Sequence, residues 1–160
     1  MSLNEDRLFP SDTTQRAIAR RLYAEVRRLP IISPHGHTDP QWFAENQPFP
    51  DPAALLITPD HYIYRMLYSQ GIPLESLGIP RKDGGPVEQD PRKIWRLFAQ
   101  YWHLFRGTPT QMWLNHVLQH LFEVQERLTP DHADQIVYRL VSPAVGSCKM
   151  QFHVMTSFIP

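Results

Sequence analysis

The chain has 160 residues, of which 42% are hydrophobic and 20% charged, a composition typical of a globular protein with one sizeable core and not of a disordered tail. Its 16 basic and 16 acidic residues cancel, which removes the electrostatic case for nucleic acid or an anionic membrane surface and favours a small polar substrate or a protein partner. The single Cys148 cannot form an internal disulfide, no apolar run approaches the ~20 residues of a membrane span, and the first residues lack the apolar region of a signal peptide, so we expect a cytoplasmic protein.

The first helix is predicted to begin after an N-cap at Ser11 and to end at Pro30. Apolar residues recur along it at intervals of three and four, as one face of a helix requires: Ile18, Leu22, Val26 and Leu29. Arginines crowd its other face: Arg16, Arg20, Arg21, Arg27 and Arg28. We interpret them as a solvated face with cations near the negative helix end, and we keep an anion site as the alternative.

Residues 31–34, which begin with the last two residues of the apolar run 29–32, predict a strand too short to stand alone. A lone strand has unpaired backbone groups on both edges, and burying them without partners is costly. The strand therefore either pairs with another chain or has the rest of its sheet missing.

Two histidines, His35 and His37, come directly after this strand. Side chains alternate across an extended strand, so residues two apart send both imidazoles to the same side, where together they can hold one metal ion. The pattern alone is weak, because a chain with 8 histidines in 160 residues contains roughly 0.4 such pairs by chance. The metal hypothesis therefore depends on its context.

A loop rich in proline is predicted over residues 38–52, and helices are predicted after it. Four residues with capping side chains each precede a proline: Thr58, Asp90, Thr108 and Thr129. The predicted helices span residues 59–70, 91–106, 109–123 and 130–141, with glycines at the C-cap positions 71 and 107. The polar residues 81–85 predict an exposed and mobile loop.

Two apolar stripes on these helices predict packing of helix against helix. One stripe consists of Ile94, Leu97, Phe98, Tyr101, Leu104 and Phe105. The other consists of Trp113, Leu114, Val117, Leu118 and Leu121. We interpret both as core and not as a cofactor site.

The periodic pattern ends near Val141, and the last acidic residue is Asp134. We interpret residues 141–160 as an atypical tail produced by a truncation or a frame change, with an ordinary C-terminal extension as the alternative. The predicted organisation is an N-terminal helix with one strand in residues 1–40, a helical cluster in residues 41–140, and this tail.

Residues 31–40, which contain the His35 and His37 pair, resemble the first barrel strand of the amidohydrolase superfamily. Three later segments narrow the resemblance to the uronate isomerase family, also called glucuronate isomerase. Residues 60–67 with Gly71-Ile72 are similar to that family's Asp-His-Tyr helix, residues 105–114 to its Gly-Thr-Pro helix start, and residues 126–129 to the entry of its next helix. The resemblance runs in order from about residue 7 to residue 140.

This resemblance implies an α/β fold, a (β/α)₈ TIM barrel of the metal-dependent hydrolase type with a helical insertion. The chain, mostly α-helical and shorter than the ~250 residues typical of such a barrel, would supply the first strand and the insertion. The implied reaction interconverts D-glucuronate with D-fructuronate, and D-galacturonate with D-tagaturonate, in hexuronate catabolism, at a site that holds a divalent metal, commonly zinc. The expected partner is the hexuronate, with no nucleic acid and no membrane, and a homo-oligomer is left open.

The resemblance also assigns roles to single residues. It implies that His35 and His37 are the first two metal ligands, and that Tyr62 helps to hold the substrate carboxylate, with a core tyrosine as the alternative. His61 and Arg65 belong to the same motif; Arg65 lies one turn from Tyr62, where an ordinary salt bridge is equally expected. The family's other ligands and its catalytic acid/base lie in later strands, and no matching motif occurs here. Two imidazoles are an incomplete site for catalytic zinc, so we expect the isolated chain to be inactive.

Two other functions remain open. A self-contained helical binding module, in which His35 and His37 are structural, predicts a cooperatively folding monomer. The enzyme hypothesis instead predicts exposed apolar surface at the strand and the first helix. Another metal-dependent hydrolase with the same histidine strand explains residues 60–62 less well.

A second histidine pair, His116 and His120, has the spacing of one helix face. The residues between them lack the glutamate of the zinc-protease motif, so we interpret the pair as structural. His103, His132 and His153 have no partner at the spacing of metal ligands.

Overall fold

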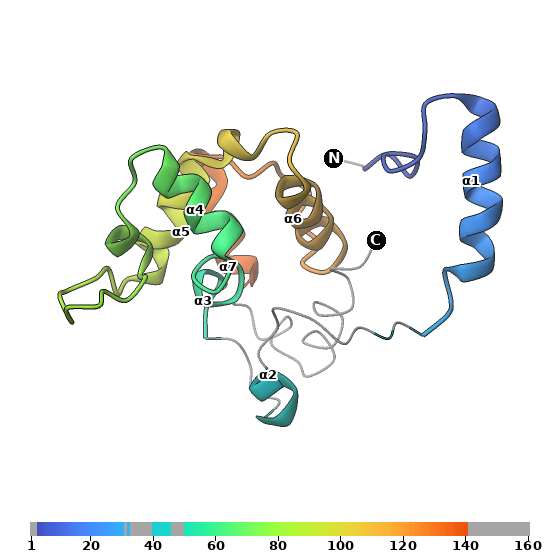
Figure 1. The fold of residues 1–160 in the computed structure, drawn as a ribbon. Helices are drawn as coiled ribbons and strands as arrows, with labels where there is room; N and C mark the ends of the chain where they lie inside the picture. Colours follow the sequence, from blue (N-terminus) through green and yellow to red (C-terminus); the bar gives the residue numbers. More distant parts are fainter. Residues whose placement is uncertain (1–2, 31, 33–39, 46–49, 141–160) are drawn as a thin grey trace. The chain divides into compact units, whose positions relative to one another are not determined.

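The computed structural model describes residues 3–30, 32, 40–45 and 50–140 (Figure 1). The chain divides into two compact units, residues 2–39 and residues 40–160. All regular structure in the described ranges is helical, and no helix in them is long and apolar enough to cross a membrane. The predicted strand 31–34 (apart from Ile32), the pair His35 and His37, and the predicted tail 141–160 lie outside the described residues.

In the first unit, helix α1 (Thr13–Val26) occupies most of the predicted first helix and ends before Pro30. The prediction of Ser11 as its N-cap is wrong by one residue. The Asp12 carboxylate accepts a hydrogen bond from the Gln15 backbone N–H at 2.8 Å, so Asp12 satisfies the open end of the helix.

The apolar stripe of α1 lies on the surface, and no residue of this helix is buried. Large apolar side chains are exposed along the helix and beyond both of its ends: Leu8, Ile18, Leu22, Tyr23, Val26, Leu29 and Ile32. Leu22, for example, keeps 63% of its surface exposed. The exposed surface that the enzyme hypothesis expects at the first helix is therefore present.

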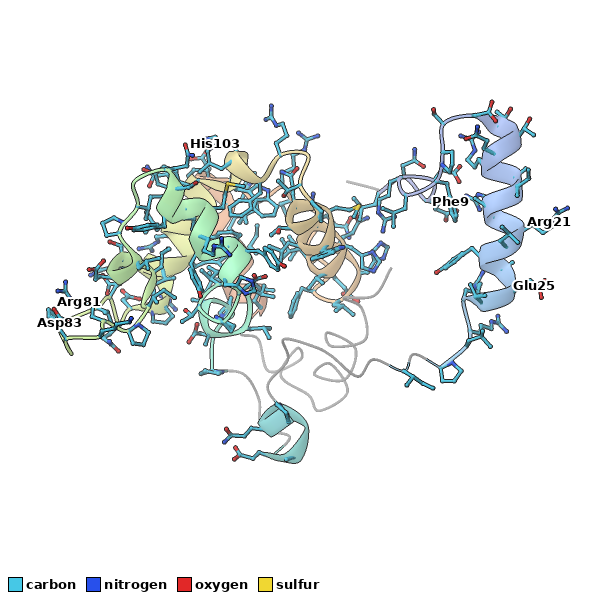
Figure 2. The ribbon with its side chains drawn as sticks, viewed as in Figure 1. Phe9, Arg21, Glu25, Arg81, Asp83 and His103 are labelled. Carbon is cyan, nitrogen blue, oxygen red and sulfur yellow. The ribbon has the colours of Figure 1, made fainter. Side chains whose placement is uncertain are left out.

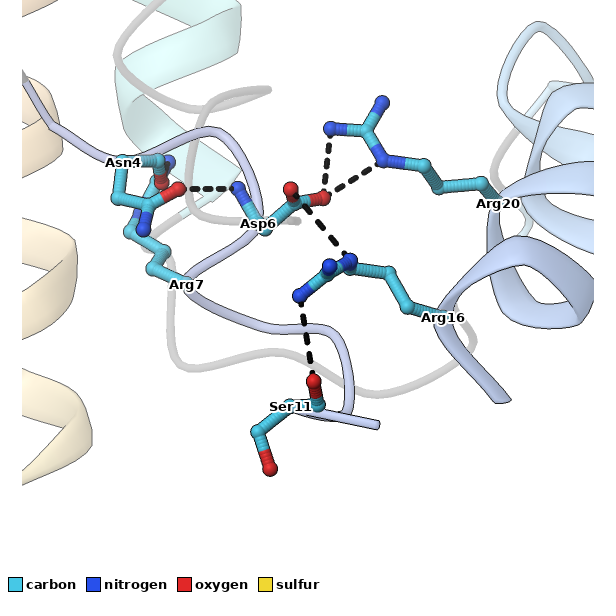
Figure 3. Close-up of polar contacts among 6 residues, drawn as sticks. All are labelled: Asn4, Asp6, Arg7, Ser11, Arg16 and Arg20. Carbon is cyan, nitrogen blue, oxygen red and sulfur yellow. Dashed lines mark hydrogen bonds and ion pairs between the residues drawn. The ribbon is translucent and has the colours of Figure 1, made fainter. Parts of the chain in front are cut away.

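An ionic cluster holds the N-terminal turn against α1 (Figure 3). The Asp6 carboxylate accepts a hydrogen bond from Arg20 Nε at 2.6 Å and lies 3.7 Å from Arg16 Nε, and the hydrogen bond from Arg20 lowers the pKa of Asp6. The Arg20 guanidinium lies 5.5 Å from the Phe9 ring centroid, and the Phe9 ring meets the Tyr23 ring edge to face. Two of the five arginines of the predicted cationic face are thus paired within the protein, while Arg21 extends outward from the helix (Figure 2).

The second unit contains short α-helices and 3₁₀ helices in sequence. The α-helices are α2 (Pro40–Glu45), α3 (Pro52–Leu56), α4 (His61–Ser69), α5 (Pro91–Gln100), α6 (Pro109–His120) and α7 (Ala133–Leu140). The 3₁₀ helices are η1 (Leu74–Leu77), η2 (Trp102–Phe105) and η3 (Pro130–His132). The predicted helix 91–106 is thus α5 continued by η2, and the predicted helix 130–141 begins with η3.

Helix α2 corrects the prediction of a loop over residues 38–52, and α3, which begins at the last residue of that range, was not predicted. Helix α3 begins at Pro52 behind Asp51, whose carboxylate accepts from the Ala54 backbone N–H at 2.8 Å. The same chemistry, an acidic cap before a proline, is what predicted α5 at Asp90. The signal was therefore present in the sequence and was hidden by the surrounding prolines.

The predicted cap of α4 at Thr58 is also wrong. The helix begins two residues after Pro59, and Asp60 is its N-cap. The Thr58 hydroxyl instead donates to the Leu77 carbonyl at 3.4 Å, which joins α3 to η1. Asp60 could have been predicted as the N-cap from the sequence, because a carboxylate at this position caps a helix as well as a hydroxyl does.

The other predicted ends agree better with the structure. The carboxylate of Asp90 and the hydroxyl of Thr108 accept hydrogen bonds from the first turns of α5 and α6, as predicted, and Thr129 precedes η3 without a side-chain cap bond. The glycines at the two predicted C-cap positions, Gly71 and Gly107, both adopt positive φ angles, of 85° and 78°.

The core of this unit is built around the aromatic side chains of α5 and η2. The first predicted stripe packs into it, and so does the second apart from Trp113, with some members only half-buried. The indole N–H of Trp95, a side chain almost fully buried, donates to the Ala133 carbonyl at 3.0 Å and so joins α5 to the start of α7. The Phe98 ring lies within 5.3–5.7 Å of the Trp95, Trp102 and Phe105 ring centroids.

The polar loop 81–85 is largely exposed, as predicted, and its shape is fixed by charge (Figure 2). Arg81 binds Asp83 through two guanidinium nitrogens and reaches Glu75 at 3.0 Å. The Asp83 carboxylate also accepts from the Gly85 backbone N–H at 3.0 Å. The bonds from Arg81, and then from Gly85, lower the pKa of Asp83 to about 2.

We expect the substitution Trp95→Phe to lower the free energy of unfolding of the chain by about 1–3 kcal/mol, because it removes a buried hydrogen bond and part of the ring that fills the core. Urea denaturation followed by circular dichroism measures this loss. Trp113→Phe, at a half-buried position on α6, is the matched control and should cost less. Equal losses in the two variants would contradict a special role for the Trp95 bond.

The Asp83 carboxyl should titrate near pH 2 in a ¹³C NMR titration, below its ordinary value of 3.8. Because the folded pKa is depressed, the contribution of this group to stability is present above pH 3.8 and is lost as the pH falls through about 2. Arg81→Met should return the midpoint toward 3.8, whereas Arg92→Met, at an exposed position on α5, should leave it in place.

Candidate functional site

The start of helix α4 carries the residues that the sequence predicts to bind substrate. Asp60 has an extended backbone, and its carboxylate accepts from the Tyr62 backbone N–H at 2.8 Å. Ile63 and Leu67, one turn apart, are fully buried and hold one face of the helix in the core. With 3.6 residues per turn, this anchoring directs the positions of Tyr62 and Arg65 to the opposite face.

The predicted substrate-binding side chains are accessible. Tyr62 keeps 60% of its surface exposed, Arg65 is exposed, and His61 is half-buried. The His61 and Tyr62 rings lie 4.3 Å apart between centroids, tilted by 31°. Tyr62 therefore lies outside the core of the described residues, in which the buried positions of this helix are Ile63 and Leu67.

These side chains offer the chemistry that a sugar acid requires. The phenol of Tyr62 and the imidazole of His61 can donate hydrogen bonds, and the Arg65 guanidinium carries a permanent charge with several donors. Charge-assisted bonds to a carboxylate are about twice as strong as neutral ones. Tyr68, with 61% of its surface exposed on the same helix, is equally accessible but lies outside the Asp60-His61-Tyr62 motif.

The metal ligands predicted from the sequence, His35 and His37, lie outside the described residues, so their geometry stays a prediction. Within the described ranges, no group of three His, Cys, Asp or Glu side chains is arranged to hold a metal ion. The ring of His132 lies 3.3 Å from the Thr129 hydroxyl and 3.3 Å from the Arg127 carbonyl, which fits a structural histidine. The rings of His116 and His120 are neighbours on α6, as their spacing predicts.

Comparison with known proteins decides the family. The family model described as glucuronate isomerase matches residues 6–151. The chain belongs to the glucuronate isomerase family. The match includes all the motifs that carried the sequence resemblance, and it extends beyond residue 140, where that resemblance ended.

Relatives in this family are considerably longer than the chain. It is 60% identical over 136 residues to the uronate isomerase of Brucella canis, and 57% identical over 148 residues to that of Xanthomonas euvesicatoria pv. vesicatoria. These alignments include 85% and 90% of this chain but only 29% and 31% of the relatives. The chain therefore corresponds to the N-terminal portion of a uronate isomerase and spans less than a third of the length of these relatives.

Solved structures of the family agree with the fold of the chain. The glucuronate isomerase from Caulobacter crescentus matches with a TM-score of 0.79 and 53% identity, over 91% of this chain and 31% of that protein. The uronate isomerase from Thermotoga maritima matches with a TM-score of 0.69 and 28% identity, over 87% and 28%. The helical arrangement described above is thus the arrangement of this family.

We expect Asp60→Ala to lower the free energy of unfolding by about 1 kcal/mol, because the first turn of α4 loses its cap. Asp60→Asn should stay within a few tenths of a kcal/mol of the unsubstituted chain, since an amide oxygen also accepts from the Tyr62 N–H. Urea denaturation compares the two variants, with the exposed Asp131→Ala as a control for loss of charge. If Asn costs as much as Ala, the cap bond is not the reason for the loss.

Proposed function

We propose that this chain is the N-terminal part of a uronate isomerase that interconverts D-glucuronate with D-fructuronate, and D-galacturonate with D-tagaturonate. The observation that carries the proposal is the family match over residues 6–151. The Asp60-His61-Tyr62 start of α4, with its exposed Tyr62, lies within that match and supports it.

The whole enzyme, in this proposal, has the (β/α)₈ barrel architecture. Residues 31–34 form the first barrel strand, and the helices of residues 41–140 form an insertion at the active-site end. In such barrels the active site lies at the carboxyl ends of the strands. This architecture would place His35 and His37, which directly follow the strand, in the site.

The reaction requires a group that binds the substrate and a group that moves a proton. Hydrogen moves between C1 and C2 of the sugar, so a base has to remove the proton beside the carbonyl while charge develops on the neighbouring oxygens. We assign Tyr62 to the substrate carboxylate, with His61 and Arg65 as supporting donors. We assign the proton-transferring base to the part of the family's length that this chain does not span.

His35 and His37 are the residues of this chain that would hold a divalent metal. Imidazole nitrogen suits zinc, and two imidazoles supply two of the three protein ligands usual at a catalytic zinc site. When bound, the metal would supply Lewis-acid stabilisation of the charge on the sugar oxygens. The third protein ligand is assigned, like the base, to the remainder of the enzyme.

A chimera tests this proposal. Residues 6–140 of this chain would replace the matching segment of the Caulobacter crescentus glucuronate isomerase, with which the chain is 53% identical. We expect the chimera to isomerise D-glucuronate. Loss of a residue that only supports a metal ligand lowers activity about 10–100-fold. We expect His35→Ala or His37→Ala, which remove a ligand itself, to lower kcat by more than this. A folded chimera without isomerase activity would contradict the proposal.

Within the chimera, Tyr62→Phe should raise KM about tenfold or more, because a hydrogen bond to a charged carboxylate is lost. Tyr68→Phe is the matched control, since both tyrosines lie on α4 with 60% and 61% of their surfaces exposed, and it should leave KM unchanged. An equal rise in KM in the two variants would contradict the assignment of Tyr62 to the substrate carboxylate. The isolated 160-residue chain should show no metal-dependent turnover.

A further inference from the structure

Helix α6 presents two imidazoles side by side on a rigid support. Leu114, Val117 and Leu118 are buried and fix this helix in the core of its unit. His116 and His120 are one turn apart, and their ring centroids lie 4.5 Å apart with the rings tilted by 41°. His116 is half-buried, whereas His120, at the end of the helix, is exposed.

We propose that His116 and His120 form a bidentate binding site for a borderline transition-metal ion such as Ni²⁺, Cu²⁺ or Zn²⁺. A metal ion ~2.0–2.1 Å from one nitrogen of each ring holds the two ring centroids about 5 Å apart at a tetrahedral angle. The observed 4.5 Å is close to this separation.

The chemistry of the pair selects the class of ion. Imidazole nitrogen binds borderline transition metals and has little affinity for Mg²⁺ or Ca²⁺, which prefer oxygen ligands. Each ring has two nitrogens, so the nitrogen given to a metal leaves the other for a second partner, and such a partner orients the ring. The partial burial of His116 reduces the side-chain freedom that binding would remove.

The residues around His116 and His120 determine how the site binds a metal ion and whether it can catalyse a reaction. No third His, Cys, Asp or Glu completes a group of three with this pair in the described part of the chain, so the described residues supply two ligands to the site. Affinity should therefore follow the usual order for nitrogen sites, with Cu²⁺ above Ni²⁺ and Zn²⁺. Because Val117 stands where a zinc protease has its general base, the site binds a metal and does not hydrolyse peptides.

The test uses the 160-residue chain with His35→Ala and His37→Ala, which removes the other histidine pair. Calorimetric titration with NiCl₂ should give one site per chain. Adding His120→Ala should weaken this site at least about tenfold, because one of two chelating ligands is lost. His103→Ala, at an exposed histidine on η2 (Figure 2), should leave the affinity unchanged.

NMR locates the ion independently of affinity. Substoichiometric Ni²⁺ should broaden the ring proton signals of His116 and His120 before those of any other histidine. Circular dichroism checks that His120→Ala is folded, and His120→Gln provides a second variant at this exposed position. Absence of nickel binding, equal affinity in the His120 variants, or broadening first at another histidine would each overturn the proposal. None of these results depends on isomerase activity.

Discussion

The packing of α5 against α7 through Trp95 is the interaction on which the helical unit depends. A buried indole N–H needs an acceptor, since leaving it without one costs about 1–3 kcal/mol. The Ala133 carbonyl, 38 residues along the chain, supplies it. One position further along both helices, the guanidinium of Arg96 binds both carboxylate oxygens of Asp134, at 2.7 and 2.9 Å. The buried bond and the exposed ion pair fix the same register between the two helices, and the buried bond contributes the larger part because surface pairs are worth little.

The candidate site depends on this core through α4. Ile63 and Leu67 are fully buried in the same cluster as Trp95 and Phe98. Once these two positions face inward, the 3.6-residue repeat leaves no choice about which face Tyr62 and Arg65 occupy. The Asp60 cap then sets the residue at which the helix begins. None of the proposed substrate-binding residues belongs to the core, but the core determines the direction in which they point.

Local chemistry predicts much of this structure from the sequence, and long-range contacts explain what it misses. Proline after a capping residue predicted α5 and α6 correctly because cap and proline act within one turn. The same rule wrongly predicted Thr58 as the N-cap of α4 in place of Asp60. Both residues are good N-caps, and only the hydrogen bond from Thr58 to Leu77, 19 residues away, shows that Thr58 has another role. The change from α5 to η2 near Tyr101 follows no residue that breaks helices. For the site, motif similarity predicted that His61, Tyr62 and Arg65 belong to one motif, with Arg65 one turn from Tyr62, but the contact between the His61 and Tyr62 rings is visible only in the structure.

The two units contrast in how they treat their apolar surface, and this contrast supports the proposed enzyme over a binding module. The unit that contains α4–α7 buries the large side chains of α5 and η2, such as Trp95, Phe98 and Phe105, whereas α1 exposes Ile18, Leu22 and Val26 in a helical stripe. Burying such side chains is worth about 1.5–3 kcal/mol each, so a stripe of this kind is stable only where another surface covers it. In the proposed barrel, α1 directly precedes the first strand, and helices in that position cover the sheet. Within its own unit α1 has no apolar partner for Ile18, Leu22 and Val26 in the described residues, which is what a helix that covers a sheet elsewhere in the enzyme would show.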